Sequence, residues 1–329
     1  MLEHGGQLRR AAERFGIAVH DWLDLSTGIN PRGWPVPAVE SLHWQRLPEA
    51  GDGLEAAARD YYECRRILPT AGSQAAIQAL PRMCARSQVG VLAPEYSEHA
   101  HGWYQAGHEV VRLDHQAIRQ PPSSLDVVVL SNPNNPTGHE LDRDALLNIR
   151  TEMASRDGWL VVDEAFRDND PAASCMAETD KPGLIVLRSL GKFFGLAGAR
   201  IGFVAAETGL LERLGEWLGP WPLSGPARIV AQQALRDHEW QQRARAYLER
   251  DSMRLAELLT RTGLAPTGGC VLFQWVARND AESLYVQLAR QGVLVRLFTQ
   301  PAGLRFGLPG HEAGWQRLES VLGQLEMTA

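Results

Sequence analysis

The sequence contains very little lysine. Only Lys181 and Lys192 stand against 31 arginines in the 329 residues. Arginine replaces lysine in most surface roles, but its guanidinium is never a free amine nucleophile at working pH, so it cannot form a Schiff base. Lys181 lies between Asp180 and Pro182 and is predicted to be a solvated loop residue. Lys192 lies in the glycine-rich, apolar segment 189–202, which makes it a candidate for covalent carbonyl chemistry.

Other absences exclude several classes of protein. The four cysteines lie far apart without a Cys-x-x-Cys pair, so neither zinc nor a disulfide framework is indicated, and buried thiols in a reducing cytoplasm are expected. No apolar run is long enough to span a membrane, and the polar start does not form a signal peptide. The net charge of −6, without blocks of like charge, argues against nucleic-acid binding. We therefore expect a cytoplasmic protein without a metal, a membrane partner or a nucleic-acid partner.

The middle of the chain alternates short apolar runs with amphipathic segments, which predicts an α/β domain with parallel strands. Asp142–Arg156 is the candidate crossover helix, opened by an aspartate cap. A long helical stretch is expected over approximately 227–260 and a shorter one over 281–291. Strands are expected at 90–92, 127–131, 159–163, 184–188 and 200–205, and further along at 270–276, 294–297 and 304–307.

The length of the chain and a change of character near 221–226 predict two domains. Residues 45–222 are expected to form a large domain with a mostly parallel central sheet flanked by helices. Residues 1–44 together with 223–329 are expected to form a smaller α+β domain.

Polar motifs follow three consecutive predicted strands. The sequence Ser-Asn-Pro-Asn-Asn-Pro-Thr-Gly covers 131–138, Asp-Glu-Ala-Phe covers 163–166, and Ser189–Lys192 follows the third strand. Ligands of open α/β sheets bind outside the carboxyl ends of the strands. Asn135, Asp163 and Lys192 are therefore predicted to share one crevice.

The residue types of this crevice fit pyridoxal 5′-phosphate. A lysine supplies the amine for a Schiff base, a carboxylate holds a pyridine nitrogen protonated, and an asparagine hydrogen-bonds a phenolate oxygen. A phosphate would find backbone, hydroxyl and guanidinium donors at a predicted helix start and beyond the lysine strand. These donors belong to Gly72, Ser73, Gln74, Ser189 and Arg200.

This set resembles the fold type I pyridoxal-phosphate enzymes of the aminotransferase class I/II superfamily, over most of the chain. The resemblance implies that Lys192 forms the Schiff base, Asp163 partners the pyridine nitrogen and Asn135 binds the O3′ oxygen of the cofactor. It implies that Gly72, Ser73, Gln74, Ser189 and Arg200 bind the cofactor phosphate, that Tyr96 or its rival His99 stacks on the ring, and that Arg305 meets the substrate carboxylate.

Two positions depart from the family pattern. Many relatives have tyrosine where Phe166 stands, so a second hydrogen bond to O3′ is missing and the electronics of the cofactor are expected to differ. Many also have tyrosine where Leu47 stands, reaching the phosphate of the neighbouring subunit. The family implies a homodimer, but this contact across it is lost.

The choice of reaction depends on the N-terminal segments. Glu3-His4-Gly5-Gly6, the segment 23–35 and the segment 46–54 resemble the cobalamin-pathway branch, the L-threonine O-3-phosphate decarboxylases, and the last segment resembles the aerobic pathway in particular. That resemblance implies decarboxylation to (R)-1-amino-2-propanol O-2-phosphate, with Lys192 reprotonating Cα. The candidate substrate contacts are His4, Asn30, Arg32 and Arg305; which arginine meets the phosphate and which the carboxylate stays open.

Two alternatives stay open as well. A phosphate-substrate aminotransferase similar to histidinol-phosphate aminotransferase would use the same residues and remove the Cα proton instead of CO₂. A non-catalytic pyridoxal-binding regulatory domain is disfavoured by the intact Lys192.

Overall fold

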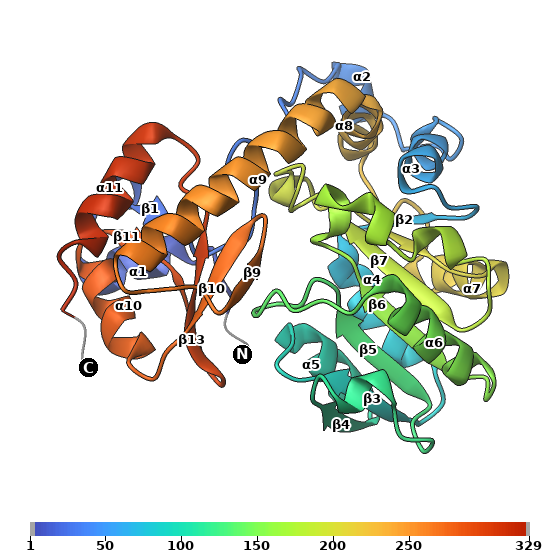
Figure 1. Ribbon diagram of the computed structural model, residues 1–329. Helices are drawn as coiled ribbons and strands as arrows, with labels where there is room; N and C mark the ends of the chain where they lie inside the picture. The colour runs from blue at the N-terminus through green and yellow to red at the C-terminus, as the bar shows by residue number, and fades with distance from the viewer. Residues whose placement is uncertain (1–3, 327–329) are drawn as a thin grey trace. The chain divides into compact units, whose positions relative to one another are not determined.

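The computed structural model describes residues 4–326, which form two compact units (Figure 1). The sheet unit contains residues 34–135 and 140–242, and the terminal unit contains the described parts of 1–33, 136–139 and 243–329. These limits differ from those expected for the two domains, 45–222 and 1–44 with 223–329, and that domain division stays a prediction.

The sheet unit is built on seven strands in the order β2-β8-β7-β6-β5-β3-β4. Strands β4, β3, β5, β6 and β7 are parallel, whereas β8 is antiparallel to both β7 and β2. The predicted, mostly parallel central sheet is therefore confirmed. The bounds are β2 (Leu68–Thr70), β3 (Gln88–Leu92), β4 (Glu109–Leu113), β5 (Val127–Ser131), β6 (Trp159–Asp163), β7 (Leu184–Ser189) and β8 (Gly202–Ala205).

Helices cover both faces of this sheet, and the inner strands β5, β6 and β7 are accordingly buried along almost their whole length. Val127 and Val129 pack in one cluster with Leu210 and Leu214, while helix α6 covers the opposite face (Figure 1). Asp142 caps α6, as predicted, by accepting the N–H of Ala145 at 2.8 Å. The helices are α2 (Ser41–Gln45), α3 (Leu54–Tyr62), α4 (Ser73–Ala79), α5 (Ser97–Gln105), α6 (Arg143–Ala154), α7 (Thr208–Leu218) and α8 (Gly225–Arg236).

The helical stretch predicted over approximately 227–260 is confirmed, but it consists of two helices. Helix α8 ends at Arg236 and a second helix, α9, runs over His238–Arg261, from the sheet unit into the terminal unit. Asp237 breaks the run because its Oδ1 caps α9 by accepting the N–H of Trp240, while its Oδ2 accepts Nε1 of Trp34.

An ion-pair cluster attaches α8 to the sheet unit. The Arg228 guanidinium donates to both oxygens of Asp52 at 2.6 and 2.7 Å and to Glu55 at 2.8 Å. Arg228 is almost fully buried, so these charge-assisted bonds compensate its desolvation. The segment 225–236 therefore packs on α3, at the start of the sheet unit.

The terminal unit is α+β, as expected. A four-stranded antiparallel sheet has the order β12-β13-β10-β9, and the short strand β1 near the N-terminus pairs in parallel with β11. Ala11 and Trp22 pack with Ala289 and Leu294, which joins the first residues to the C-terminal part. The remaining elements are α1 (Leu8–Phe15), β1 (Leu23–Asp24), β9 (Gly268–Cys270), β10 (Phe273–Ala277), α10 (Ala281–Arg290), β11 (Val293–Leu294), β12 (Arg296–Thr299), β13 (Ala302–Gly307) and α11 (Glu312–Leu322).

Within residues 4–326, no helix combines the length and the apolar character needed to cross a membrane.

Candidate functional site

A cavity of about 140 Å³ lies in the sheet unit where β5, β6 and β7 end, and we call it the strand-end pocket. The register pairs Ser131 with Asp163 across β5 and β6, so the motifs that follow the two strands emerge side by side. The pocket brings together most of the predicted cofactor residues. It is lined by Ser73, Gln74, Tyr96, Ser131, Asn135, Asp163, Ala165, Phe166, Ser189, Lys192 and Arg200.

Lys192 projects from a segment fixed by its neighbours. The N–H of Leu190 donates to the carbonyl of Ile201, and the N–H of Leu196 donates back to the carbonyl of Leu190. The side chains of Phe193 and Phe194 are fully buried beneath it, whereas Lys192 is partly exposed. The Nζ atom lies 5.4 Å from the centroid of the Phe166 ring. The Lys192 amine therefore lies at the pocket, on a segment whose neighbouring phenylalanines are buried.

Asp163 is buried and its two oxygens have different partners. Oδ1 accepts the N–H of Ala165 at 3.0 Å, and Oδ2 lies 3.0 Å from Nε2 of His99. Burial alone would lower the pKa of His99, but the bond to Asp163 and nearby negative charges raise it. The contact with Asp163 therefore favours the protonated form of the imidazole.

Of the two candidates for the stacking residue, Tyr96 lines the strand-end pocket and His99 does not. The Tyr96 hydroxyl donates to Oε1 of Gln74 at 3.3 Å. His99 is only 1% exposed and sits behind Asp163. The position of each residue favours Tyr96 for contact with a ring.

The turn before α4 is shaped to hold an anion. Gly72 has a φ of +72°, and a Cβ added there would come within 2.7 Å of Nη2 of Arg200. A Cβ at Gly202 would come within 2.3 Å of the N atom of Ser73. The absence of side chains at both glycines lets the guanidinium lie against the turn, beside the hydroxyls of Ser73 and Ser189. Such a donor set fits the phosphate of pyridoxal phosphate.

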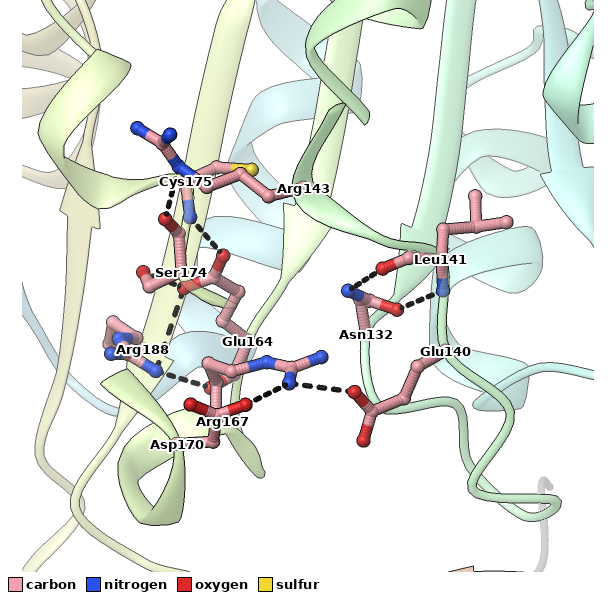
Figure 2. Close-up of polar contacts among 10 residues, drawn as sticks. All are labelled: Asn132, Glu140, Leu141, Arg143, Glu164, Arg167, Asp170, Ser174, Cys175 and Arg188. Atoms are coloured by element: carbon pink, nitrogen blue, oxygen red, sulfur yellow. Dashed lines mark hydrogen bonds and ion pairs between the residues drawn. The ribbon is translucent and has the colours of Figure 1, made fainter. Parts of the chain in front are cut away.

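Asn132 is a supporting residue that we did not predict from the sequence. Its Nδ2 donates to the carbonyl of Leu141 at 3.0 Å, and its Oδ1 accepts the N–H of Leu141 at 2.9 Å (Figure 2). These two hydrogen bonds close the loop that carries Asn135. The signal was present as the first asparagine of the 131–138 motif, but its partner lies nine residues away and depends on the fold.

Glu164 and Arg188 form a second buried support (Figure 2), and each is next in the sequence to a predicted site residue. The Glu164 carboxylate accepts the hydroxyl of Ser174 at 2.5 Å and the N–H of Cys175 at 2.8 Å. Arg188 Nη1 donates to the Glu164 carbonyl at 3.0 Å and lies 3.6 Å from its carboxylate. Since Asp163 precedes one partner and Ser189 follows the other, this pair holds both strand ends in place.

The remaining predicted residues belong to the terminal unit. Asn30 donates from Nδ2 to the hydroxyl of Tyr247 at 2.5 Å, and that hydroxyl donates to the carbonyl of Arg32 at 2.7 Å. The Arg32 guanidinium forms an ion pair with Asp251 and lies 3.9 Å above the Tyr247 ring. Asn30 and Arg32 are therefore held by this network within the terminal unit.

His4 lines a second cavity, of about 410 Å³, which we call the terminal-unit pocket. Glu3, which precedes His4 in the predicted motif, lies outside the described residues. Arg296 lines the same cavity and was missed from the sequence, where it is one of 31 arginines. Arg10, Arg14, Ser26 and Glu282 also contribute to the walls.

Arg305 is the cross-strand partner of Arg296 in the β12–β13 pair, so the two side chains share a face of the sheet. Arg305 is 7% exposed and donates from Nη2 to the carbonyl of Ser26 at 3.2 Å. Burial, together with the like charge of Arg296, lowers the pKa of Arg305 to about 10. An anion bound at this pair would offset both penalties.

The parallel strands with a lysine, an aspartate and an asparagine at their ends define a protein of the aminotransferase fold. The chain belongs to the aminotransferase class I and II family, whose model matches residues 50–317. It is 54% identical to the threonine-phosphate decarboxylase of Pseudomonas aeruginosa over 98% of this chain and 97% of that protein. It is 41% identical to the threonine-phosphate decarboxylase of a Sinorhizobium species over 99% of both chains.

Among solved structures, the histidinol-phosphate aminotransferase from Sinorhizobium meliloti in complex with pyridoxal-5′-phosphate matches with a TM-score of 0.84. The match covers 98% of this chain and 95% of that one at 19% identity, and it supports the fold.

Proposed function

We propose that this protein is a pyridoxal-phosphate-dependent decarboxylase that converts L-threonine O-3-phosphate to (R)-1-amino-2-propanol O-2-phosphate in cobalamin biosynthesis. The identity of 54% with a threonine-phosphate decarboxylase, over nearly the whole chain, carries the choice of substrate. The side chains of the strand-end pocket support the choice of cofactor, because they supply an amine, a carboxylate, an amide and an anion cradle in one cavity.

The cofactor would be held by the strand-end pocket. We assign its covalent attachment to Lys192, its pyridine nitrogen to Asp163 and its O3′ oxygen to Asn135. The phosphate would be bound by Arg200 with the turn and hydroxyls of Gly72, Ser73, Gln74 and Ser189, and the ring would lie between Tyr96 and the apolar wall that includes Phe166. When bound, pyridoxal phosphate supplies an electron sink conjugated to Cα of the substrate.

The residues of this chain then decide what happens at Cα. The Cα–carboxylate bond breaks, CO₂ leaves, and the electron pair stays at Cα. The Lys192 ammonium is the acid that delivers a proton to Cα, which forms the new C–H bond and leaves a neutral amine. Asp163, held by its contact with His99 and by the N–H of Ala165, would present a carboxylate that needs no reorganisation during this step.

The terminal unit would recognise the anionic groups of the substrate. Arg305 and Arg296 lie opposite each other on neighbouring strands, and charge repulsion between them is relieved when a carboxylate or phosphate binds. His4, Asn30 and Arg32 complete the proposed contacts. The bonds of Asn30 to Tyr247 and of Arg32 to Asp251 hold these two side chains in one orientation, so little conformational entropy is lost when a substrate binds.

We also propose that the protein works as a homodimer in the cytoplasm. Leu42, Trp44 and Leu47, on and just after α2, are 51%, 69% and 64% exposed. Large apolar side chains gathered on one short segment are typical of a surface that a second chain covers. Sedimentation of the purified protein measures this directly, and a monomer at all concentrations would contradict it.

The proposed reaction is tested by incubating the holoenzyme with L-threonine O-3-phosphate alone. Release of CO₂ without a keto acid is expected. Turnover that requires 2-oxoglutarate would identify an aminotransferase instead, the second candidate that the fold allows. Tight binding of pyridoxal phosphate without either reaction would favour a regulatory role.

The lysine assignment is tested with Lys192→Ala, compared with Lys181→Ala, a partly exposed surface lysine paired with Glu178. Loss of the attachment amine and of the proton donor should lower kcat by roughly a hundred- to ten-thousandfold or more. Borohydride should no longer attach pyridoxal phosphate to the variant, whereas Lys181→Ala should behave as the parent protein. Retention of the borohydride-dependent label in Lys192→Ala would contradict the assignment.

A further inference from the structure

Glu95 lies where three segments of the strand-end pocket meet. Its Oε1 accepts the N–H of Tyr96 at 2.7 Å. Its Oε2 accepts the N–H of Ser131, the last residue of β5, at 2.6 Å, and Nδ2 of Asn134 lies 3.4 Å from the same oxygen. One carboxylate therefore fixes the backbone that presents Tyr96 and the start of the loop that presents Asn135.

The same carboxylate also belongs to the surroundings of His99. The N–H of His99 donates to the carbonyl of Tyr96 at 3.0 Å, so the helix turn that carries the imidazole starts directly after Glu95. The groups that face the imidazole are Asp163 from β6, Glu95 from the preceding loop, Glu98 from α5 and the edge-on ring of Tyr96 at 6.0 Å.

Glu95, His99 and Asp163 are ionisable groups that lie close together in a mostly buried region. Burial raises the pKa of Glu95, while the positive charge of His99 and the N–H donors of Ser131 and Tyr96 oppose that rise. In turn, the negative charges of Asp163, Glu95 and Glu98 raise the pKa of His99 against its burial. The opposite charges of Glu95 and His99 thus favour each other, and Asp163, which bonds His99, lines the pocket.

We propose that Glu95 is a positioning residue for the cofactor site: it ties Tyr96 to the Ser131–Asn135 segment and places its carboxyl group near His99, which in turn bonds Asp163. The inference rests on the proposed function, because it assumes that Asp163, Tyr96 and Asn135 receive pyridoxal phosphate. Glu95 itself does not line the pocket and acts only through these residues.

Glutamine and aspartate at this position separate charge from shape. In Glu95→Gln the amide nitrogen cannot accept an N–H, so the variant loses the negative charge and one of the two backbone bonds. Glu95→Asp keeps the charge on a shorter side chain. Glu109→Gln, at an exposed position on β4, is the matched control for the loss of one carboxylate.

The experiment has two independent readouts. The first is the dissociation constant of pyridoxal phosphate, followed by its visible absorbance. The second is the titration of the His99 ring nitrogens by NMR in the holoenzyme, assigned with His99→Asn. We expect Glu95→Gln to bind pyridoxal phosphate roughly tenfold more weakly and to move the His99 midpoint to lower pH. We expect Glu95→Asp to keep the midpoint near that of the parent protein while losing affinity, and Glu109→Gln to change neither.

Glu95→Gln with the affinity and His99 titration of the control overturns the inference. Weaker binding with an unmoved His99 titration also overturns it, because Glu95 would then act by packing alone. If Glu95→Gln does not fold, Glu95→Asp is used for the test. An unchanged affinity of Glu95→Asp for pyridoxal phosphate then overturns the inference. A parent protein that does not bind pyridoxal phosphate refutes the proposed function instead, and it is recognised before any variant is compared.

Discussion

The two polar pockets of this molecule differ in charge and in how their side chains are held. The strand-end pocket combines Asp163, Lys192 and Arg200, so both signs of charge are present, and buried partners such as His99 support them. In the terminal-unit pocket the lining cations, Arg10 and Arg14 of α1 and Arg296 of β12, outnumber the single lining carboxylate, that of Glu282.

This difference separates two tasks. A pocket whose charges are already balanced holds a resident group in one geometry and contributes preorganised electrostatics to a reaction. A pocket with an excess of positive charge pays an electrostatic penalty until an anion enters, so it discriminates by charge. We therefore expect variants in the sheet unit to change cofactor binding and variants in the terminal unit to change substrate recognition.

Among the variants that compare the two units, Arg305→Gln has the largest expected effect. Arg305→Gln should lower kcat/KM for L-threonine O-3-phosphate by about a hundredfold, because a charge-assisted bond to a substrate anion is lost in a buried site. The affinity for pyridoxal phosphate should stay that of the parent protein. Steady-state kinetics and a cofactor titration measure the two quantities separately.

Arg261→Gln is the control for this variant, since Arg261 is an exposed arginine paired with Glu319. It should leave both quantities unchanged. An equal loss of cofactor affinity in Arg305→Gln would show that the two units do not separate cofactor binding from substrate recognition.

A smaller effect is expected from the anion cradle. Gly72→Ala places a Cβ within 2.7 Å of Nη2 of Arg200 at a positive φ, so the guanidinium must move and the turn is strained. Pyridoxal phosphate should bind roughly tenfold more weakly, which a titration of its absorbance detects. Gly198→Ala is the matched control because nothing lies within 4 Å of the added atom. Equal affinities of the two variants for pyridoxal phosphate would contradict the assignment of Arg200 to the phosphate site.

The smallest effect concerns stability and pH. The folded-state pKa of His99 is raised above its usual 6.5, so its charged bond to Asp163 stabilises the fold fully below that value. The contribution is lost as the pH rises through the folded pKa. His99→Asn keeps a neutral donor, so it should be less stable than the parent protein by about 1 kcal/mol at acidic pH, and the gap should close as the pH rises.

Urea unfolding of both proteins across a pH series measures this gap. His101→Asn, which changes an exposed histidine, should show no such trend. A gap that is constant with pH would mean that the imidazole next to Asp163 is not charged.

Sequence reasoning was most successful where a feature is local. The strands at 127–131 and 159–163 and the aspartate cap of α6 follow from runs of valine and leucine and from one Asp position. It failed at Asp237, where helical periodicity continues through the residue that ends α8 and caps α9. Whether Asp237 caps a helix depends on the rotamer of its side chain. Trp34, which donates to the other oxygen of Asp237, is 203 residues away in the sequence.

The amino-acid sequence alone was sufficient to predict that Asn135, Asp163 and Lys192 meet, because each lies at the end of a strand or a few residues beyond it and parallel strands end at one edge of a sheet. Only the tertiary structure pairs Arg296 with Arg305 and joins Glu95 to His99 and Asp163. Those contacts arise from strand register and from loops that meet in space. Periodicity and spacing record which face a residue occupies, but they do not record its partner across the sheet.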